Sequence, residues 1–567
     1  MTKYDILKVI IKECDIVIDT IEIVIKDKKY TYSKNITLQE IYMEHQETHN
    51  YPIIIAKVNN RLRELSYKLT ENCTVEFLDL TSSEGNRVHI SGLIFVIIYA
   101  VKKLYGKDAD IRVRHSLDKG IYIQTTFKLT EEKLSKIKEK MKEIIKKDLP
   151  IKRLMIDRFE AINYFNEIGD PVKSKVLRYN TDNYISLYRL GNIYNYFYSL
   201  MPPSTGKVKD FDLTYIKGNG FNLRFPTVHI NNKIPKYVPH PKMLEVFSRY
   251  KEWAKLIKLE ASVDLNRVVS TGKVSDLIKI DETVQSNRLL FLAKDINDRK
   301  DKLKIVLLAG PSSSGKTTTS RKLCMYLKIF GLNPKTLSMD DYFLEREKTP
   351  LDEHGNPDFE CLEAIDLKLF DKQVSALLKG EEVTLPTYNF IIGEKEYQEK
   401  MKLEENDILI IEGIHALDSR ILTNIRKEKK YKVYIAPLTE LNIDNHNRIS
   451  TTDNRLLRRI VRDNRTRNYP VEKTLKQWSK VREGEEKYIF PYQDEADAMV
   501  NSAAIYEIGV LKTYVEPLLY SVENTSPYYE DAKRLINFLR LFLPIPADSI
   551  PEDAVIREFI GGSYFHK

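Results

Sequence analysis

The stretch Gly310-Pro311-Ser312-Ser313-Ser314-Gly315-Lys316-Thr317 decides the fold of the second half of this chain. It fits the phosphate-loop pattern, in which a glycine and four further residues precede Gly-Lys and a serine or threonine. An apolar run over residues 305–309 comes before it and predicts a buried parallel strand. Residues 318–330 carry apolar side chains at helical spacing and end at Gly331, which predicts a helix.

This phosphate loop (residues 310–317) is expected to bind a nucleoside triphosphate. Its glycines permit a turn whose backbone N–H groups point inward, and the following helix N-terminus, with Thr318, adds donors for phosphate oxygens. Lys316 is expected to reach the β- and γ-phosphates, and the Thr317 hydroxyl is expected to bind Mg²⁺. The alternative is a glycine-rich turn that binds nothing. All fixed positions of the pattern are filled, which favours ATP and Mg²⁺ as ligands.

Length and composition limit the remaining classes of protein. A chain of 567 residues is too long for one core and indicates roughly three or four domains. No run of eighteen apolar residues and no apolar N-terminal segment is evident, so we expect a cytoplasmic protein without a membrane span. Four widely spaced cysteines are expected to be reduced. The net charge of +9 is compatible with phosphate-bearing partners, but spread over this length it favours a solvated basic surface.

Residues 1–80 predict a small β-grasp domain. Residues 21–25 and 30–32 are expected to pair as a hairpin, followed by a helix over 37–44 and strands over 52–58 and 73–80. His45 and His49 have helical spacing, but no further metal ligand is evident nearby, which favours a surface helix end. Residues 81–228 predict an α+β domain with a long apolar helix over 93–104, strands at 110–113 and 120–127, and an amphipathic helix over 130–147.

Three segments of this first half carry a resemblance to a known family: residues 87–92 (RVHISG), 140–153 (KMKEIIKKDLPIKR) and 203–208 (PSTGKV). Together with the β-grasp pattern they resemble the amino-terminal half of threonyl-tRNA synthetases, a TGS domain followed by the domain that edits mischarged tRNA. The resemblance implies an RNA or nucleotide ligand for this N-terminal module (residues 1–228).

The same resemblance argues against editing activity. In that family the editing site uses two histidines spaced His-x-x-x-His and a later cysteine and histidine. This sequence keeps His89, whereas Leu93, Phe197 and Met201 stand at the other three positions. Three polar positions are apolar, so the N-terminal module is expected to bind or regulate without a metal site and without hydrolysis.

Residues 229–300 predict a helical connector. Prolines at 235, 239 and 241 mark a break, and helices are expected over 243–259 and 275–301. The domain that contains the phosphate loop is assigned to residues 301–545, and residues 546–567 form a C-terminal tail for which the sequence predicts no function.

Two acidic residues are expected beside the phosphate loop. Asp340 follows a predicted strand over 334–339, and Glu412 follows a strongly apolar strand over 407–411. Ligands of parallel α/β sheets gather at the carboxyl ends of the strands. A carboxylate there can accept a hydroxyl proton or hold Mg²⁺. Each acid taken alone could equally be a solvated loop residue, but together with the phosphate loop they predict a site.

A run of arginines follows in residues 454–468: Arg455, Arg458, Arg459, Arg462, Arg465 and Arg467. A basic solvated helix face and a nucleic-acid-binding helix are two interpretations of such a run. Because it follows a phosphate loop in the same domain, we favour a lid whose guanidinium groups close over the triphosphate and exclude water.

Residues 303–502 resemble uridine kinase, in the wider family of uridine kinases and phosphoribulokinases. The segments that carry this resemblance are Leu337–Phe343, Asp358–Glu360, Leu385–Phe390, Glu412–Ile414 and Asp453–Gln477. The resemblance implies a general base at Asp340, which also lies near the metal, and a Mg²⁺ contact at Glu412. It implies contacts to the acceptor nucleoside from Glu360, Tyr388, Arg459 and Gln477. Phosphate contacts and catalytic roles are implied for Lys316, Arg459, Arg462 and Arg467.

Two departures concern the base of the nucleoside. Gly393 stands where pyrimidine-selective members have a histidine, and Tyr469 stands where they have a second arginine. The sequence therefore predicts an ATP-dependent nucleoside kinase, with uridine or cytidine as the acceptor by family. Two alternatives remain open: an RNA-binding, translation-linked regulator that uses ATP as a switch, and a kinase of a different small alcohol. Homo-oligomers are common in the family and are compatible with this sequence.

Overall fold

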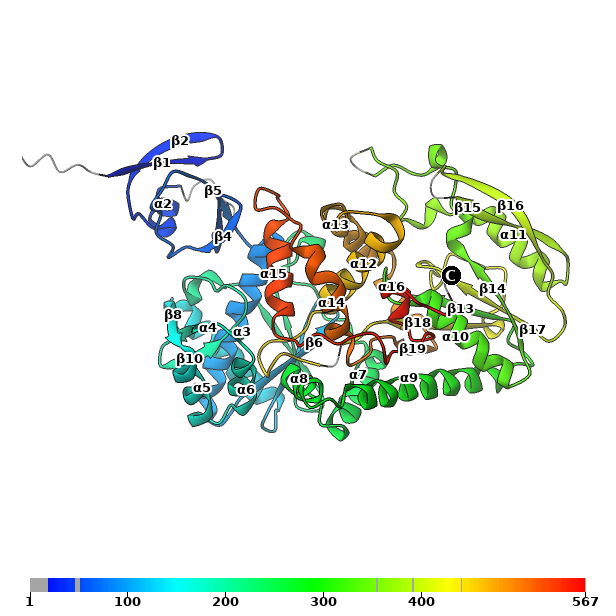
Figure 1. Ribbon diagram of the computed structural model, residues 1–567, viewed down its shortest axis with the longest axis horizontal. Coiled ribbons are helices and arrows are strands. Elements are labelled where there is room, and N and C mark those ends of the chain that lie inside the picture. Colours follow the sequence, from blue (N-terminus) through cyan, green and yellow to red (C-terminus); the bar gives the residue numbers. More distant parts are fainter. Residues whose placement is uncertain (1–18, 46–50, 353–354, 390–391, 440, 566–567) are drawn as a thin grey trace, which may run out of the picture.

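The computed structural model describes residues 19–45, 51–352, 355–389, 392–439 and 441–565 (Figure 1). His49 and Cys14 lie outside these ranges. The described cysteines, Cys73, Cys324 and Cys361, are free thiols. Figure 1 shows the N-terminal sheet at one end of the molecule and the sheet that carries the phosphate loop toward the other.

The first domain is a five-stranded sheet in the order β2-β1-β5-β3-β4, with one helix packed on it. Its elements are β1 (Thr20–Ile25), β2 (Lys28–Ser33), α2 (Leu38–Glu44), β3 (Ile55–Val58), β4 (Arg61–Glu64) and β5 (Cys73–Leu78). The central strands β1 and β5 run parallel, and both flanking pairs are antiparallel. Thr37 caps α2 in a capping box with Glu40. The predicted β-grasp arrangement is confirmed, although the sequence analysis missed the short strand β4.

The second domain packs helices against two antiparallel sheets, β10-β9-β8 and β11-β12-β7-β6. Its helices are α3 (Ser83–Tyr105), α4 (Glu131–Lys146), α5 (Arg158–Glu167) and α6 (Pro171–Arg178). Its strands are β6 (Ile111–Leu117), β7 (Gly120–Thr125), β8 (Ile151–Asp157), β9 (Tyr184–Leu190), β10 (Ile193–Tyr196), β11 (Asp212–Ile216) and β12 (Gly220–Arg224).

Helix α3 begins ten residues before the predicted start at Leu93, because Ser82 caps its first turn by accepting a hydrogen bond from the Gly85 N–H. Of the described helices, α3 alone is long and apolar enough to cross a membrane by length and mean hydropathy. In the structure 61% of that apolar window is buried inside the protein, as in the core helix of a folded domain.

Three helices fill residues 241–297: α7 (Pro241–Leu256), α8 (Ser262–Ser270) and α9 (Val274–Asn297). They are more than a connector. Leu289, Ala293 and Ile296 of α9 pack into the same core as the strand before the phosphate loop, and Val263 and Leu265 of α8 join a core with the last helices of the chain. The sequence analysis missed α8.

The sheet of the last domain has five parallel strands in the order β14-β17-β13-β18-β19. They are β13 (Ile305–Ala309), β14 (Asn333–Ser338), β17 (Asp407–Glu412), β18 (Lys430–Ala436) and β19 (Ala498–Asn501). Every residue of β13 is buried, because helices cover both faces of the sheet. The predicted parallel sheet with flanking helices is confirmed. The strands β14, β17 and β13 are neighbours in the sheet, so the residues that follow their carboxyl ends lie close together.

The remaining helices and strands complete the second half of the chain. They are α10 (Lys316–Ile329), α11 (Leu367–Leu378), the hairpin β15 (Val383–Asn389) and β16 (Glu394–Met401), α12 (Thr451–Arg467), α13 (Val471–Tyr488), α14 (Glu507–Leu519), α15 (Tyr529–Leu539) and α16 (Arg557–Ile560). Figure 1 shows α16, near the C-terminus, beside α10 and α12.

Candidate active site

The phosphate loop joins β13 to α10 with the backbone that its sequence requires. Gly315 has a φ of +81° and Ser313 a φ of +59°, so two residues of the turn are left-handed. A Cβ atom on Gly310 would collide with the Ile435 carbonyl oxygen of the neighbouring strand. The hydroxyl oxygens of Ser313 and Ser314 are buried and have no hydrogen-bond partner in the described chain. Unpartnered hydroxyl donors in this loop fit the oxygen-rich phosphates of a nucleotide.

Lys316 and two carboxylates lie at the carboxyl ends of the three adjacent strands. Asp340 stands in the short 3₁₀ turn Met339–Tyr342 directly after β14, and Glu412 is the last residue of β17. The Thr317 hydroxyl donates to Glu412 Oε1 over 3.2 Å. Register brings these groups together, because Ser338 pairs with Glu412, and Leu308 in β13 pairs with Glu412 on the other side.

Burial controls the charge of both carboxylates. It raises the pKa of Glu412 to about 7, and the negative charge of Asp340 adds to the rise while Lys316 opposes it. Burial likewise raises the pKa of Asp340, against the opposing effects of Lys316, Arg467 and Arg462. Oxygen ligands of this kind suit Mg²⁺, so Thr317, Glu412 and Asp340 fit the metal that the sequence predicts.

A third carboxylate, the half-buried Glu360, faces the same space from the segment after Asp358. Burial raises its pKa to about 7; the nearby charges of Glu485 and Asp340 raise it further and Arg459 lowers it. Its side chain packs against Gly484 of α13, where a Cβ atom would meet Glu360 Cβ at 2.6 Å. Glu360 and Arg459, predicted to hold the same substrate group, are therefore neighbours.

An aromatic group lies beside these charges. Tyr388, on β15, is buried, and its ring packs edge-on against Phe343 with ring centroids 5.7 Å apart. Phe343 also contacts Phe359, with centroids 5.5 Å apart. The Tyr388 backbone N–H donates to Asp341 Oδ1, the residue next to the predicted base, over 3.2 Å. Gln477 lies half-buried in α13, and no hydrogen bond or ion pair in the described chain ties it to this group.

The arginines of α12 divide into two sets. Arg455 and Arg458 are fully buried and donate to the carbonyl oxygens of Ser312 and Ser313, so they hold the phosphate loop itself. Arg458 also pairs with Glu507 at 2.5 Å, and Arg465 donates to the carbonyl oxygen of Phe559 at 3.1 Å.

The second set, Arg459, Arg462 and Arg467, shares one carboxylate. Asp463 is fully buried and lies 3.1 Å from Arg459, 2.9 Å from Arg462 and 3.5 Å from Arg467. Arg459 also donates to the Ser312 hydroxyl in the phosphate loop over 2.9 Å. The three predicted phosphate contacts are thus anchored on one side chain at the edge of the loop.

Two acids that organise this site, Asp463 and Glu485, were not predicted from the sequence. The i, i+4 spacing of Asp463 from both Arg459 and Arg467 was a usable signal for the first. The second is Glu485 of α13, which pairs with Arg455 and accepts a hydrogen bond from the Ser312 N–H over 3.1 Å. Its i, i+3 pair with Arg482 of α13 is local, but the contacts that make Glu485 part of the site, to Arg455 and Ser312, come from other elements, and no local pattern predicts them.

The C-terminal tail lies on the phosphate loop. Glu558 Oε2 accepts hydrogen bonds from the Thr318 N–H over 3.1 Å and from the Thr318 hydroxyl over 2.8 Å. Val555 packs on Gly315, and Arg465 of α12 donates to the Glu558 carbonyl oxygen over 3.0 Å. The first-turn N–H groups after such a loop are donors for nucleotide phosphates. A carboxylate therefore occupies one of the donors that a nucleotide needs.

Gly393 and Tyr469, which differ from the residues of pyrimidine-selective kinases, each lie beside a basic side chain. Gly393 has a φ of +81°, and a Cβ atom there would lie 3.0 Å from the Arg346 side chain, whose backbone N–H donates to the Gly393 carbonyl oxygen. Arg346 therefore fills the space beside position 393. Tyr469 lies under Lys473, with the ammonium nitrogen 3.5 Å from the ring centroid.

The predicted editing positions of the second domain form a core. Leu93, Phe197 and Met201 are buried in one hydrophobic cluster, and His89 is fully buried on the same helix as Leu93. His89 Nε2 lies 3.3 Å from the Asp210 carbonyl oxygen, and burial lowers its pKa to about 4. Within the described ranges, no group of three or more His, Cys, Asp or Glu residues could hold a metal ion.

Comparison with known proteins shows what the last domain is similar to. Residues 305–508 match the model of the phosphoribulokinase / uridine kinase family. The C-terminal region of this chain is similar to that family. A phosphoribulokinase from Rhodobacter spheroides is 16% identical, with a TM-score of 0.25 over 35% of this chain and 68% of that one. A possible uridine kinase from Bacillus stearothermophilus is 26% identical, with a TM-score of 0.22 over 26% of this chain and 79% of that one.

The N-terminal part matches a different enzyme. A threonine–tRNA ligase from Clostridium kluyveri is 29% identical over 230 residues, which are 40% of this chain and 34% of the ligase. The chain thus spans about a third of the length of the curated relatives it matches. Both predicted resemblances are confirmed, and this protein joins a P-loop kinase domain to a synthetase-like module.

Proposed function

We propose that this protein is an ATP-dependent nucleoside kinase of the phosphoribulokinase / uridine kinase family that phosphorylates a 5′-hydroxyl group. The observation that carries the proposal is the convergence of Asp340, Glu360 and Arg459 beside the phosphate loop. The charges of Arg459 and Asp340 both act on the pKa of Glu360, and Arg459 donates to the Ser312 hydroxyl over 2.9 Å, so these groups lie near one another at the loop.

In the proposed reaction Asp340 accepts the proton of the acceptor hydroxyl as that oxygen attacks the γ-phosphorus and the bond to the β-phosphate oxygen breaks. A carboxylate with a raised pKa is a stronger base than an exposed aspartate, which suits this role. Lys316 and the arginines held by Asp463 surround the transferring phosphoryl group with positive charge. Closing α12 over the site would exclude water and so protect ATP from hydrolysis.

Mg²⁺ fits the oxygen ligands at Thr317, Glu412 and Asp340, and when bound it would neutralise charge on the β- and γ-phosphates. Mg²⁺ requires the carboxylate form of Glu412. Because burial raises the pKa of Glu412 to about 7, part of this side chain is protonated at neutral pH, and metal binding releases protons. Release of protons when Mg²⁺ is added is therefore a readout of this site that needs no turnover.

The acceptor is proposed to be a ribonucleoside. Glu360 and Arg459 offer an acceptor and a donor side by side, which suits the two ribose hydroxyls. Tyr388 and Phe343 present aromatic surface for a base next to them. Uridine and cytidine come first by family, and Arg346, which fills the space beside Gly393, is the residue that we expect to distinguish bases.

The test is ADP release by the purified protein with ATP and Mg²⁺ against a panel of nucleosides and sugar phosphates. Turnover of uridine or cytidine supports the proposal. Turnover of a different alcohol keeps Asp340 as the base but overturns the nucleoside assignment. No turnover with any acceptor would favour the alternative, a regulator that binds RNA and uses ATP as a switch.

A further inference from the structure

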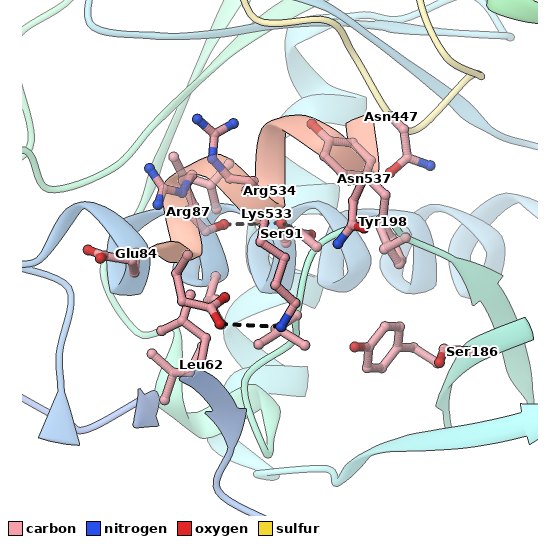
Figure 2. Close-up of a pocket in the computed structure, with 18 of the residues that line it drawn as sticks. Leu62, Glu84, Arg87, Ser91, Ser186, Tyr198, Asn447, Lys533, Arg534 and Asn537 are labelled. Atoms are coloured by element: carbon pink, nitrogen blue, oxygen red, sulfur yellow. Dashed lines mark hydrogen bonds and ion pairs between the residues drawn. The ribbon is translucent and has the colours of Figure 1, made fainter. Parts of the chain in front are cut away.

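A large cavity lies between the N-terminal module and the last helices of the chain (Figure 2). Its volume is about 1550 Å³, above the range of roughly 300–1000 Å³ that drug-sized ligands usually occupy. The walls come from β4, the first turns of α3, the sheet β8–β9, the start of α12 and the helix α15. The cavity is distinct from the phosphate loop, none of whose residues line it.

The cavity carries an excess of positive charge. Ten arginine and lysine side chains line it against five aspartate and glutamate side chains. Four of the five acids are already engaged: Glu64 by Tyr188, Glu84 by Lys57, Asp453 by Arg534 and Glu530 by Lys533.

Several of the cations keep free donors. Arg448, which precedes α12, makes no ion pair with another described residue, and its Nη1 atom is buried without a hydrogen-bond partner. Burial lowers the pKa of Arg448, whereas Asp453 and Tyr198 oppose that change. Arg87 lies near Arg534, and its pKa is lowered by burial and next by Arg534, although Asp531 at 3.4 Å opposes the change. Asp453 keeps the pKa of Arg534 above its ordinary value. A bound anion would relieve the lowered pKa of Arg448 and of Arg87.

The two ends of the cavity differ. Figure 2 shows Arg87 and Arg534 together at one end, Lys533 pointing into the middle, and Tyr198, Asn447 and Asn537 at the other end. An anionic group suits the first end. An aromatic ring with hydrogen-bonding edges suits the second, where an aromatic side chain and two amides meet.

One helix connects the cavity to the phosphate loop. Ser450 caps α12, and Asp453 in its first turn pairs with Arg534 of the cavity wall at 2.8 Å. Arg455 and Arg459, within the next two turns of the same helix, hold Ser312 in the phosphate loop. A ligand that binds Arg534 or Arg448 therefore acts on the start of α12, and the middle of α12 holds the phosphate loop through Arg455 and Arg459.

We propose that this cavity binds a free nucleoside phosphate and that α12 transmits its occupancy to the phosphate loop. The phosphates lie among Arg87, Arg448, Lys533 and Arg534, and the base lies toward Tyr198 and Asn537. The proposal does not depend on which alcohol the kinase domain phosphorylates, because binding is measured without turnover.

The experiment is calorimetric titration of the full-length Lys316→Ala protein, in which the phosphate loop is weakened. The probes are the four ribonucleoside 5′-diphosphates, inorganic pyrophosphate and a ten-nucleotide single-stranded RNA. We expect one nucleoside diphosphate per chain to bind more tightly than pyrophosphate. Arg448→Gln and Lys533→Gln, each added to that protein, should weaken binding roughly tenfold, since each removes a charged hydrogen bond.

Lys142→Gln on the exposed face of α4 is the matched control and should leave the affinity unchanged. Lys533 lies at the surface of the cavity, so its variant tests the site even if Arg448→Gln impairs folding. Hydrogen exchange in residues 451–467 should slow when the nucleotide binds. Equal binding of pyrophosphate, binding of the RNA alone, or a nucleotide affinity that ignores both cavity variants would overturn the proposal.

Discussion

The site beside the phosphate loop and the predicted editing positions of the N-terminal module are both shielded from solvent to some degree, but they are filled in opposite ways. Around the loop, Asp340, Glu360 and Glu412 are half-buried, and nearby cations oppose the rise that burial causes in their pKa values. In the N-terminal module, Leu93 and Phe197 fill the equivalent positions with hydrocarbon. Carboxylates with shifted pKa values beside cations are typical of functional sites, whereas apolar packing contributes to stability.

Of the substitutions that test this comparison, Asp340→Asn should have the largest effect on activity. It removes the proposed base and keeps the size of the side chain, so the rate of phosphoryl transfer should fall roughly 10²- to 10⁴-fold. ATP binding should remain, because the loop and Lys316 are untouched. The measurement is kcat for ADP release beside the dissociation constant of ATP. Full activity in this variant would remove Asp340 from the mechanism.

Asp463→Asn should have the next largest effect, because three arginines lose the carboxylate that positions them. We expect kcat to fall about 10- to 100-fold while the KM for the nucleoside changes less, since loss of aligned positive charge acts mainly on the transition state. Asp108→Asn, at an exposed site far along the chain, is the control. A change in KM alone would show that Asp463 has only a structural role.

Asp340 could be predicted from the sequence, whereas the acids that organise the site from a distance could not. Asp340, Glu412 and the phosphate loop each follow an apolar run, and parallel strands bring their ends together, so local patterns suffice. Glu485 and Glu558 act on the loop from positions 173 and 246 residues beyond Ser312, and no local pattern reports such contacts.

The fold shows the same division. Strand β13 was placed to the residue, because a buried parallel strand is apolar throughout. Helix α8 and strand β4 were missed: both are short, and residues 61–64 (RLRE) are mostly charged. Their stability comes from tertiary neighbours rather than from their own sequences.

Glu558→Gln should have a smaller effect of opposite sign. The carboxylate lies on the Thr318 N–H that a phosphate would use, so removing its charge should tighten ATP binding several-fold. The KM for ATP is the measurement, with kcat unchanged. Weaker binding in this variant would show that Glu558 supports the loop instead of competing with the nucleotide.

The smallest effect on activity is expected from His89→Gln, which should leave kcat and KM unchanged. It should alter the pH dependence of stability. The folded-state pKa of His89 is about 4, below its ordinary value of 6.5, so its neutral form stabilises the fold above pH 6.5 and this contribution is lost as the pH falls toward 4. The melting temperature of His89→Gln should therefore fall less than that of the unaltered protein between pH 7 and 5.

Glu412→Gln should also change the dependence of stability on pH, but in the opposite direction to His89→Gln. The folded-state pKa of Glu412 is raised from 4.5 to about 7, so its contribution is present at low pH and is lost as the pH rises from 4.5 through 7. Without added Mg²⁺, the glutamine variant should lose less stability over that interval. Identical profiles in both proteins would contradict the assignment of Glu412 as a buried, protonated carboxylate.

The most direct test of the central claim is the identity of the product. The full-length protein is incubated with ATP, Mg²⁺ and uridine, and ADP and uridine 5′-monophosphate are quantified by mass spectrometry, with Asp340→Asn as the control. The account predicts one monophosphate for each ADP and neither product above background in the variant. ADP formed without a phosphorylated nucleoside, or equal product from the variant, would contradict it.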